Sequence, residues 1–185
     1  VESNGDKEYV YKDYFPNGGK VVVPLLEKLS TIKFLGLDSS EKKKILDIGT
    51  GVGHFVHMCN ALGHSASGTE IDSSIEQLRE IHRHYDVDVF PLEVVKQKQF
   101  DLHSKYDIIT AHRVVFDGNG RFNNVEPWSE SDWLSFRDNV FEFLNPNGVL
   151  FIKTNIKSDN RSESIVKAFG APLNGWNTLT FRLSK

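Results

Sequence analysis

Cysteine and long apolar runs are both scarce in this chain. Its 185 residues include a single cysteine, Cys59, so no disulfide can form within the chain, which fits a reducing compartment. No uninterrupted apolar run approaches the ~20 residues of a membrane-spanning helix, so no membrane association is expected. The N-terminus has no signal-peptide pattern, and the cytoplasm is therefore the expected location.

An excess of charge of one sign is also missing. The net charge is −3, and the lysines and arginines are scattered along the chain. This distribution does not indicate a broad electrostatic contact with nucleic-acid phosphates, and no nucleic-acid partner is indicated, although it leaves a local basic patch open. Hydrophobic residues make up 39% and charged residues 25% of the chain, as in globular proteins, and the length suits one core. We therefore expect a single domain over residues 1–185.

Three glycines stand in alternate positions, at 49, 51 and 53. They follow a short, mostly apolar run over 44–48, typical of a buried strand, and they precede a segment over 54–62 with helical spacing. A strand, a glycine turn and a helix in this order can hold a nucleotide, because glycine lets the backbone approach a ligand and the helix N-terminus offers free N–H groups. Glu70 closes the next apolar run, where a carboxylate can accept hydrogen bonds from ribose hydroxyls.

The residues around the turn indicate which nucleotide. Dinucleotide sites use the spacing G-x-G-x-x-G, whereas this chain has His54 where the third glycine belongs. Asp47, two residues before the first glycine, would repel a pyrophosphate but suits an ammonium group. The stretch Asp47-Ile-Gly-Thr-Gly-Val-Gly53, together with Glu70, resembles motif I and the acidic loop of class I S-adenosylmethionine-dependent methyltransferases.

That resemblance implies S-adenosylmethionine as cofactor, with S-adenosylhomocysteine as its product form. Asp47 would face the ammonium end, directly or through water, and Glu70 would bind the ribose hydroxyls. Ile71, Leu92 and Glu93 would lie beside the adenine, and Asp101 is a further adenine-side candidate. The full set of predicted cofactor-binding residues is Asp47, Gly49, Thr50, Gly51, Gly53, Glu70, Ile71, Leu92, Glu93, Ala111 and His112.

The resemblance also implies an α/β fold: a Rossmann-like, doubly wound, mostly parallel sheet of six to seven strands with helices on both faces. The alternation of strand-like and helix-like segments favours the same sheet. The C-terminal hairpin of the family is expected to be shortened, because residues 171–176 are few and rich in Pro, Asn and Gly. The predicted strands cover 44–48, 64–71, 87–92, 106–111, 149–154 and 177–183, and the predicted helices cover 21–36, 54–62, 73–84, 129–144 and 161–169. A tight turn is expected at 145–148.

The N-terminal part divides into two segments before the core at 44–185. Residues 1–19 are polar with an aromatic cluster, and they form either a frayed terminus or, as often in the family, a lid over the ligand. Residues 20–43 are expected to form a helix and a polar linker.

Methyl transfer needs alignment and exclusion of water more than covalent help. A general base is needed only if the acceptor must lose a proton. His112, at the end of the fourth predicted strand, is the best candidate for that base, although it can equally hydrogen-bond the cofactor carboxylate or a loop. Asp117 is a second, weaker candidate.

The acceptor is predicted to be a small molecule, with an oxygen atom slightly favoured. Enzymes of the family that methylate amino groups of bases or glutamine commonly carry Asn/Asp-Pro-Pro-aromatic after strand four, where this chain reads Ala111-His-Arg-Val114. No large inserted substrate domain is visible, which favours a small-molecule acceptor or an accessible group on a polymer. The loop that follows supplies aromatic residues and the arginines Arg113 and Arg121, which could hold an anionic group. The aromatic residues are Phe116, Phe122, Trp128 and Trp133.

Other functions are less well supported. A nicotinamide-dependent oxidoreductase is disfavoured by Asp47 and His54, whereas a non-catalytic module that binds S-adenosylmethionine stays open. Metal binding is not expected, because no cysteine or carboxylate completes a ligand set with the histidine pairs. Those pairs, His54 with His57 and His82 with His84, are expected at partly exposed positions.

Overall fold

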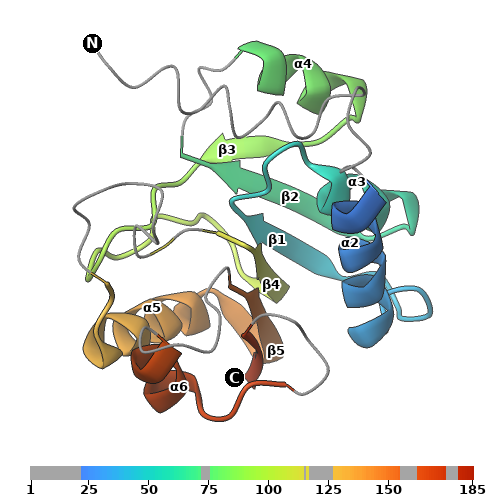
Figure 1. Cartoon of the computed structure of the whole chain (residues 1–185). Coiled ribbons are helices and arrows are strands. Elements are labelled where there is room, and N and C mark those ends of the chain that lie inside the picture. Colours follow the sequence, from blue (N-terminus) through green and yellow to red (C-terminus); the bar gives the residue numbers. More distant parts are fainter. Residues whose placement is uncertain (1–21, 72–75, 115, 117–126, 155–161, 174–178) are drawn as a thin grey trace.

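A computed structural model describes residues 22–71, 76–114, 116, 127–154, 162–173 and 179–185 of the chain. Within this part, helices flank a single sheet (Figure 1). The strands are β1 (Lys44–Ile48), β2 (Ser65–Glu70), β3 (Val89–Pro91), β4 (Tyr106–His112), β5 (Leu144–Lys153) and β6 (Thr180–Ser184). The helices are α2 (Val22–Phe34), α3 (His54–Ala61), α4 (Glu76–His84), α5 (Glu130–Glu142) and α6 (Ser162–Phe169).

The sheet has the strand order β3-β2-β1-β4-β5-β6. All neighbouring strands are parallel except β6, which runs antiparallel to β5. The predicted α/β fold with a mostly parallel sheet is therefore confirmed, with six strands among the described residues. The chain moves outward from β1 to β2 and β3 and then returns to the other side of β1 for β4. Ligands of such sheets bind beyond the carboxyl ends of the strands at this reversal.

The central strand β1 is buried on both faces. Leu46 and Ile48 pack into the larger apolar cluster, which α5 and α6 cover, and Ile45 packs into a smaller cluster under α2 and α3. The side chain of Asp47, between them, is also fully buried. Burial of a carboxylate at the end of a central strand is costly unless partners or a ligand satisfy it, so Asp47 is a candidate for a functional residue.

Strand β5 begins earlier than predicted. Tyr106 pairs with Leu144, and the next pair joins Ile108 to Val149. The turn expected at 145–148 is therefore an irregularity inside the strand rather than a connection before it. Leu144 is fully buried, and this core contact extends the strand beyond the turn residues.

Smaller differences concern the ends of elements. β6 covers Thr180–Ser184 and therefore ends one residue later than predicted, and α6 covers Ser162–Phe169; residues 161, 177 and 178 lie outside the described residues. Of the segment expected to be a stunted strand, residues 171–173 are not in a strand and the rest lies outside the described residues. The lid or frayed segment over 1–19 also lies outside them.

Helix termini follow local sequence where the signals are strong. α5 begins after Ser129, whose hydroxyl accepts from the N–H of Asp132 while the Asp132 carboxylate accepts from the N–H of Ser129, and this confirms the predicted start. On α2, Ile32 is buried, whereas Leu26 and Leu29 are 56% and 48% exposed, so the apolar spacing predicted the helix but not which residues it buries. No helix within the described residues combines the length and hydropathy of a membrane-spanning segment.

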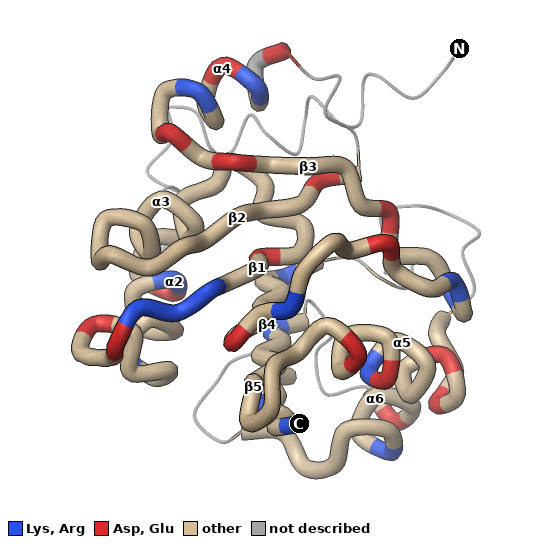
Figure 2. The backbone as a smooth tube through the Cα atoms, turned by 180° about the vertical axis from the view of Figure 1, so that it is seen from behind, with Lys and Arg blue, Asp and Glu red and all other residues tan. Residues whose placement is uncertain are grey.

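The amino and carboxyl ends of the central strands carry different charged residues (Figure 2). A lysine run, residues 42–44, leads into the amino end of β1. Asp47, Glu70 and His112 lie at or next to the carboxyl ends of β1, β2 and β4. The predicted site residues thus gather at the edge where parallel α/β sheets bind ligands.

Candidate functional site

The glycine turn between β1 and α3 has a backbone that other residues rarely adopt. Gly49, Gly51 and Gly53 have φ angles of 63°, 59° and 83°. A Cβ at Gly49 would stand 2.7 Å from Cγ2 of Val114, whereas one at Gly51 would meet nothing within 4 Å. Backbone conformation favours glycine at all three positions, and close packing also favours it at the first.

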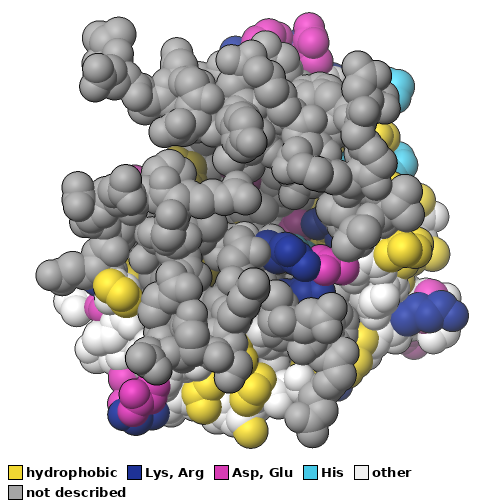
Figure 3. All heavy atoms as spheres, viewed as in Figure 1, with side chains coloured by type: hydrophobic (Ala, Val, Ile, Leu, Met, Phe, Trp, Pro, Cys, Tyr) yellow, Lys and Arg dark blue, Asp and Glu magenta, His cyan; other side chains and the backbone are white. Residues whose placement is uncertain are grey.

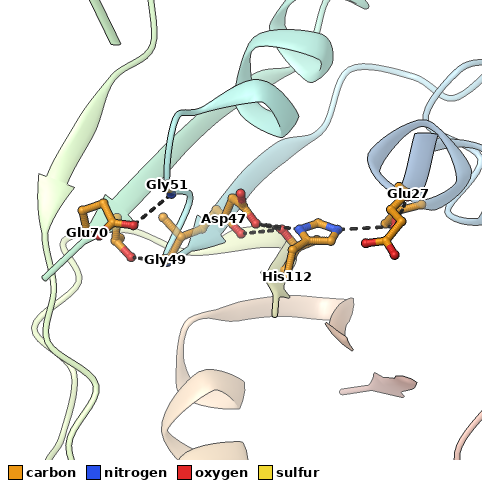
Figure 4. Close-up of polar contacts among 10 residues, drawn as sticks. Glu27, Asp47, Gly49, Gly51, Glu70 and His112 are labelled. Atoms are coloured by element: carbon orange, nitrogen blue, oxygen red, sulfur yellow. Dashed lines mark hydrogen bonds and ion pairs between the residues drawn. The ribbon is translucent and has the colours of Figure 1, made fainter. Parts of the chain in front are cut away.

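Strand β2 holds this turn from one side. The N–H of Thr50 donates to the carbonyl of Thr69 at 2.9 Å, and the N–H of Gly51 donates to Oε1 of Glu70 at 2.9 Å (Figure 4). Gly68 permits this approach, since a Cβ there would stand 2.5 Å from Cγ2 of Thr50. Burial raises the pKa of the Glu70 carboxyl above its ordinary value, although the N–H of Gly51 opposes this.

Asp47 has one satisfied and one unsatisfied oxygen. Its Oδ1 accepts from the hydroxyl of Thr110 at 2.7 Å and lies 3.0 Å from Nδ1 of His112. Its Oδ2 is buried and has no hydrogen-bond partner among the described residues. Burial opposes ionisation, but the contacts with His112 and Thr110 and the charge of Lys28 outweigh it, and the pKa of Asp47 lies below its usual range. A buried carboxylate oxygen without a partner is a ready acceptor for a cationic group.

His112 lies between Asp47 and helix α2 (Figure 4). Its Nε2 is 3.4 Å from the hydroxyl of Thr31, which donates to the carbonyl of Glu27. Burial, reinforced by the charge of Lys28, lowers the pKa of His112, so the ring is neutral at neutral pH. Because an ionised Asp47 can only accept, the ring proton belongs on Nδ1 and Nε2 carries the lone pair. The lone pair of the predicted base therefore faces α2.

A cluster of charges lies beside this pair, at the carboxyl ends of β4 and β5. Glu27 of α2 forms an ion pair with Arg113, and Nζ of Lys153 lies 3.2 Å from Oε1 of the same carboxylate. The side chain of Lys153 is only 4% exposed, and burial lowers the pKa of its amino group. Figure 3 shows basic and acidic side chains meeting near the centre of this face of the molecule.

The remaining predicted cofactor residues occupy different environments. Ala111 is fully buried within β4, which pairs with β1, and the N–H of Leu92 donates to the carbonyl of Glu70 at 3.1 Å. Ile71 is 62% exposed, and Glu93 is also exposed. Asp101 is exposed and pairs with a neighbouring histidine on the surface.

Two further predicted residues, Asp117 and Arg121, lie outside the described residues. The same holds for Phe122, whereas Trp128 and Trp133 are buried in the larger core cluster under α5 and α6. Those tryptophans therefore stabilise the fold rather than line a pocket. Burial raises the pKa of the Cys59 thiol to about 12, which agrees with the packing role expected for it.

The expectation that the histidines are partly exposed was wrong for His54 and His82. Both are buried, because His54 packs against Tyr85 and Nε2 of His82 lies 2.6 Å from the carbonyl oxygen of Gly51. Nδ1 of His54 has no hydrogen-bond partner among the described residues, and burial lowers the pKa of this ring. No cluster of three metal-ligating side chains exists within the described ranges.

Sequence reasoning missed the residues that support the turn from behind. Gly68 and Thr69 act through packing and a backbone contact, and their sequence signal was the run of small residues over 65–69, whereas Thr110 acts through its hydroxyl on Asp47 and had no such signal. Such a run permits close approach of a neighbouring loop but does not say which loop.

A cavity of about 900 Å³ lies between α4 and the β2–β3 edge of the sheet. Its lining includes Glu70 and His82 together with charged residues of α4. Among the predicted cofactor residues that the structure describes, Glu70 alone borders it. The cavity therefore adjoins the glycine turn on the side of α4.

Comparison with known families gives this geometry a context. A family model described as a methyltransferase domain matches residues 25–176. The chain belongs to this methyltransferase-domain family. The matched range includes the glycine turn, Glu70, His112 and the charge cluster. A search of curated proteins found no match.

Several solved structures share the fold. CalS10 from Micromonospora echinaspora, an amino pentose methyltransferase solved with SAM bound, is 16% identical with a TM-score of 0.52, covering 82% of this chain and 57% of its own. TrmN from Thermus thermophilus is 16% identical with a TM-score of 0.60, covering 87% and 48%. The T. thermophilus 16S rRNA methyltransferase RsmC, solved with AdoMet and guanosine, is 20% identical with a TM-score of 0.56, covering 87% and 42%. This chain thus spans about half the length of these proteins.

Proposed function

We propose that this domain binds S-adenosylmethionine at the carboxyl ends of β1, β2 and β4 and transfers its methyl group to an acceptor. One observation carries the proposal: Oδ2 of Asp47 is buried beside the glycine turn and has no partner among the described residues. The ammonium group of an amino-acid ligand would satisfy that oxygen, directly or through water, and no group of a dinucleotide pyrophosphate would. A nicotinamide cofactor is disfavoured for the same reason.

The other end of the cofactor fits β2. Glu70 is held next to the turn by the N–H of Gly51, so its carboxylate is positioned to accept hydrogen bonds from both hydroxyls of a ribose diol. Leu92 stands beside it through the bond from its N–H to the carbonyl of Glu70. Ile71, Leu92 and Glu93 remain the predicted neighbours of the adenine.

The chain's own residues would then hold and align rather than react. The bound cofactor supplies an electrophilic methyl group on a sulfonium. Asp47 and Glu70 fix its two ends, and the strand ends of β4 and β5 present the acceptor on the opposite side. If the acceptor must lose a proton, Nε2 of His112 can take it, but only once Thr31 of α2 moves from its position 3.4 Å away.

We propose a small molecule as acceptor, with an oxygen nucleophile slightly favoured, and the cytoplasm as the place of reaction. The scattered charge of the chain and the compact set of groups at the ends of β4 and β5 support a small ligand. Arg113, at this position, can pair with an anionic group of such a ligand. Transfer of the methyl group to RNA or protein would overturn the proposal of a small-molecule acceptor.

Calorimetric titration with S-adenosylhomocysteine tests the cofactor, with NADH as the comparison ligand. Micromolar affinity for the first and none for the second is expected. Absence of binding at millimolar S-adenosylhomocysteine would overturn the proposal. Incubation with S-adenosylmethionine labelled on the methyl group and separate small-molecule, RNA and protein fractions then identifies the acceptor class. Label in the small-molecule fraction is expected.

A second candidate function is a binding module that holds the cofactor without catalysis. His112 is buried, and both of its ring nitrogens lie next to protein groups, Asp47 on one side and Thr31 on the other. A histidine held in this way reaches no acceptor unless α2 moves, and this favours a module without a general base. Cofactor binding without transfer of label to any fraction would support the binding module over the enzyme.

A further inference from the structure

We propose that His82 of α4 is a positioning residue that holds the glycine turn in its ligand-binding conformation by donating a hydrogen bond to Gly51. The inference rests on the proposed cofactor function and adds a residue to that site. His82 lies twelve residues beyond Glu70, on an element whose other described side chains make no hydrogen bond to the turn.

The contact is short and enclosed. Nε2 of His82 lies 2.6 Å from the carbonyl oxygen of Gly51, and the side chain is 8% exposed. The carbonyl of His82 accepts from the N–H of Val87 at 2.9 Å, which fixes the end of α4 against the chain entering β3. The ring also lies against Gly53, where a Cβ would stand 3.4 Å from its Cδ2. The backbone of His82 is therefore fixed by Val87, and its ring contacts the turn at both Gly51 and Gly53.

Together with Glu70, this contact fixes both peptide planes of Gly51. The N–H on one side donates to Oε1 of Glu70 at 2.9 Å, and the carbonyl on the other side accepts from His82. Gly51 has φ of 59° and no atom within 4 Å of the place of a Cβ, so packing does not restrain it. A glycine free of such restraint loses much conformational entropy when ordered, and two hydrogen bonds from β2 and α4 supply the order before the ligand arrives.

The chemistry of the contact makes a specific demand on the side chain. A carbonyl oxygen only accepts, so Nε2 of His82 must carry a proton. Glutamine places an amide N–H at a similar distance from Cβ and can replace it, whereas asparagine is one methylene too short and leucine has no donor. These three substitutions separate the donor from the volume of the ring.

The test compares His82→Leu, His82→Asn and His82→Gln with the wild-type chain by calorimetric titration with S-adenosylhomocysteine, and checks folding by melting temperature. The leucine and asparagine variants are expected to bind roughly three- to tenfold more weakly, the loss of one hydrogen bond. The glutamine variant is expected to bind within about twofold of wild type. His84→Leu, at an exposed position on the same helix, serves as the matched control and is expected to bind unchanged.

The outcomes are separable. Wild-type affinity in a folded His82→Leu or His82→Asn variant would overturn the inference, and so would equal weakening in all three His82 variants, because a packing role does not distinguish glutamine. Failure of the wild-type chain itself to bind S-adenosylhomocysteine would overturn the proposed function, and the inference with it.

Discussion

Asp47 and His112, which are 65 residues apart in the sequence, meet with Oδ1 and Nδ1 at 3.0 Å inside the sheet. The contact joins β1 to β4 at the reversal of strand order, where open α/β sheets generally bind their ligands. It uses one oxygen of the carboxylate, and the other oxygen has no hydrogen-bond partner among the described residues. The pair therefore serves the fold and the proposed site at once.

Replacing Asp47 by asparagine tests the proposed ammonium contact. Asp47→Asn keeps the size of the side chain but removes its charge, and the affinity for S-adenosylhomocysteine is expected to fall by about 1.5–3 kcal/mol, or roughly ten- to hundredfold. Asp107→Asn is the matched control, because Asp107 is an acidic residue at the amino end of β4, where it accepts from the N–H of Lys44. Titration calorimetry compares the affinity of each variant for S-adenosylhomocysteine with that of the wild-type chain. An Asp47→Asn variant that binds as tightly as Asp107→Asn would contradict the assignment.

Stability should depend on pH through His54 and His112, the pKa values of which are lowered by burial. Burial lowers the pKa of His54 and of His112 in the folded chain below the ordinary value of 6.5. The unfolded chain therefore binds protons first as the pH falls, so the stabilisation is fully present above about pH 6.5 and is lost as the pH falls through the folded pKa values.

Melting temperatures across that range measure the effect. The wild-type chain is expected to melt at a lower temperature at about pH 5.5 than at about pH 7.5, and His112→Asn to show a smaller difference. An identical pH profile in the variant would show that His112 is not part of the effect.

The sequence predicted the strand–turn–helix element because each of its signals is local. The φ angles at Gly49, Gly51 and Gly53 favour glycine whatever surrounds them, and Ser129 caps its helix through Asp132, three positions away. Tertiary packing decided the rest. Leu144 extends β5 past a turn sequence because its side chain is buried.

The supporting residues of the site could not be predicted in the same way. His82 and Gly51 are 31 residues apart, and no periodicity links a helix residue to a loop carbonyl. Thr31 is likewise 81 residues from His112. These contacts exist only after the chain is folded. The sequence therefore predicted candidate ligand-binding residues, but not the residues that hold them in position.

The ribose assignment can be tested on protein and ligand together. Glu70→Ala is expected to weaken binding of S-adenosylhomocysteine by about 1–3 kcal/mol through lost charge-assisted hydrogen bonds. A 2′-deoxy analogue should bind the wild-type chain more weakly, but should lose little further affinity in the variant, because the partner of the missing hydroxyl is already gone. Additive losses, measured by calorimetry over the four combinations, would place the hydroxyl away from Glu70.

Glu27 ties α2 to the sheet, and its neutralisation should loosen that helix. Burial opposes ionisation of Glu27, but its bonds with Arg113 and Lys153 prevail, and the pKa of its carboxyl lies below the usual range. Glu27→Gln keeps the shape and weakens the contact with the buried amino group of Lys153, so the free energy of unfolding is expected to fall by about 1–2 kcal/mol at neutral pH.

The control for this variant is Glu163→Gln. Glu163 pairs with Lys167 on the exposed face of α6, so this substitution should leave the melting temperature unchanged. The difference between wild type and Glu27→Gln should shrink as the pH falls below about 4.5, because protonation removes the same charge from the wild-type chain. Denaturant unfolding at neutral and acidic pH measures the difference in the free energy of unfolding between wild type and Glu27→Gln, and thermal unfolding measures the melting temperature of Glu163→Gln. The same contacts hold α2 over Nε2 of His112, so Glu27→Gln should also increase hydrogen exchange at the backbone of α2. Reduced stability with unchanged exchange in α2 would instead assign the loss of stability to β4 and β5.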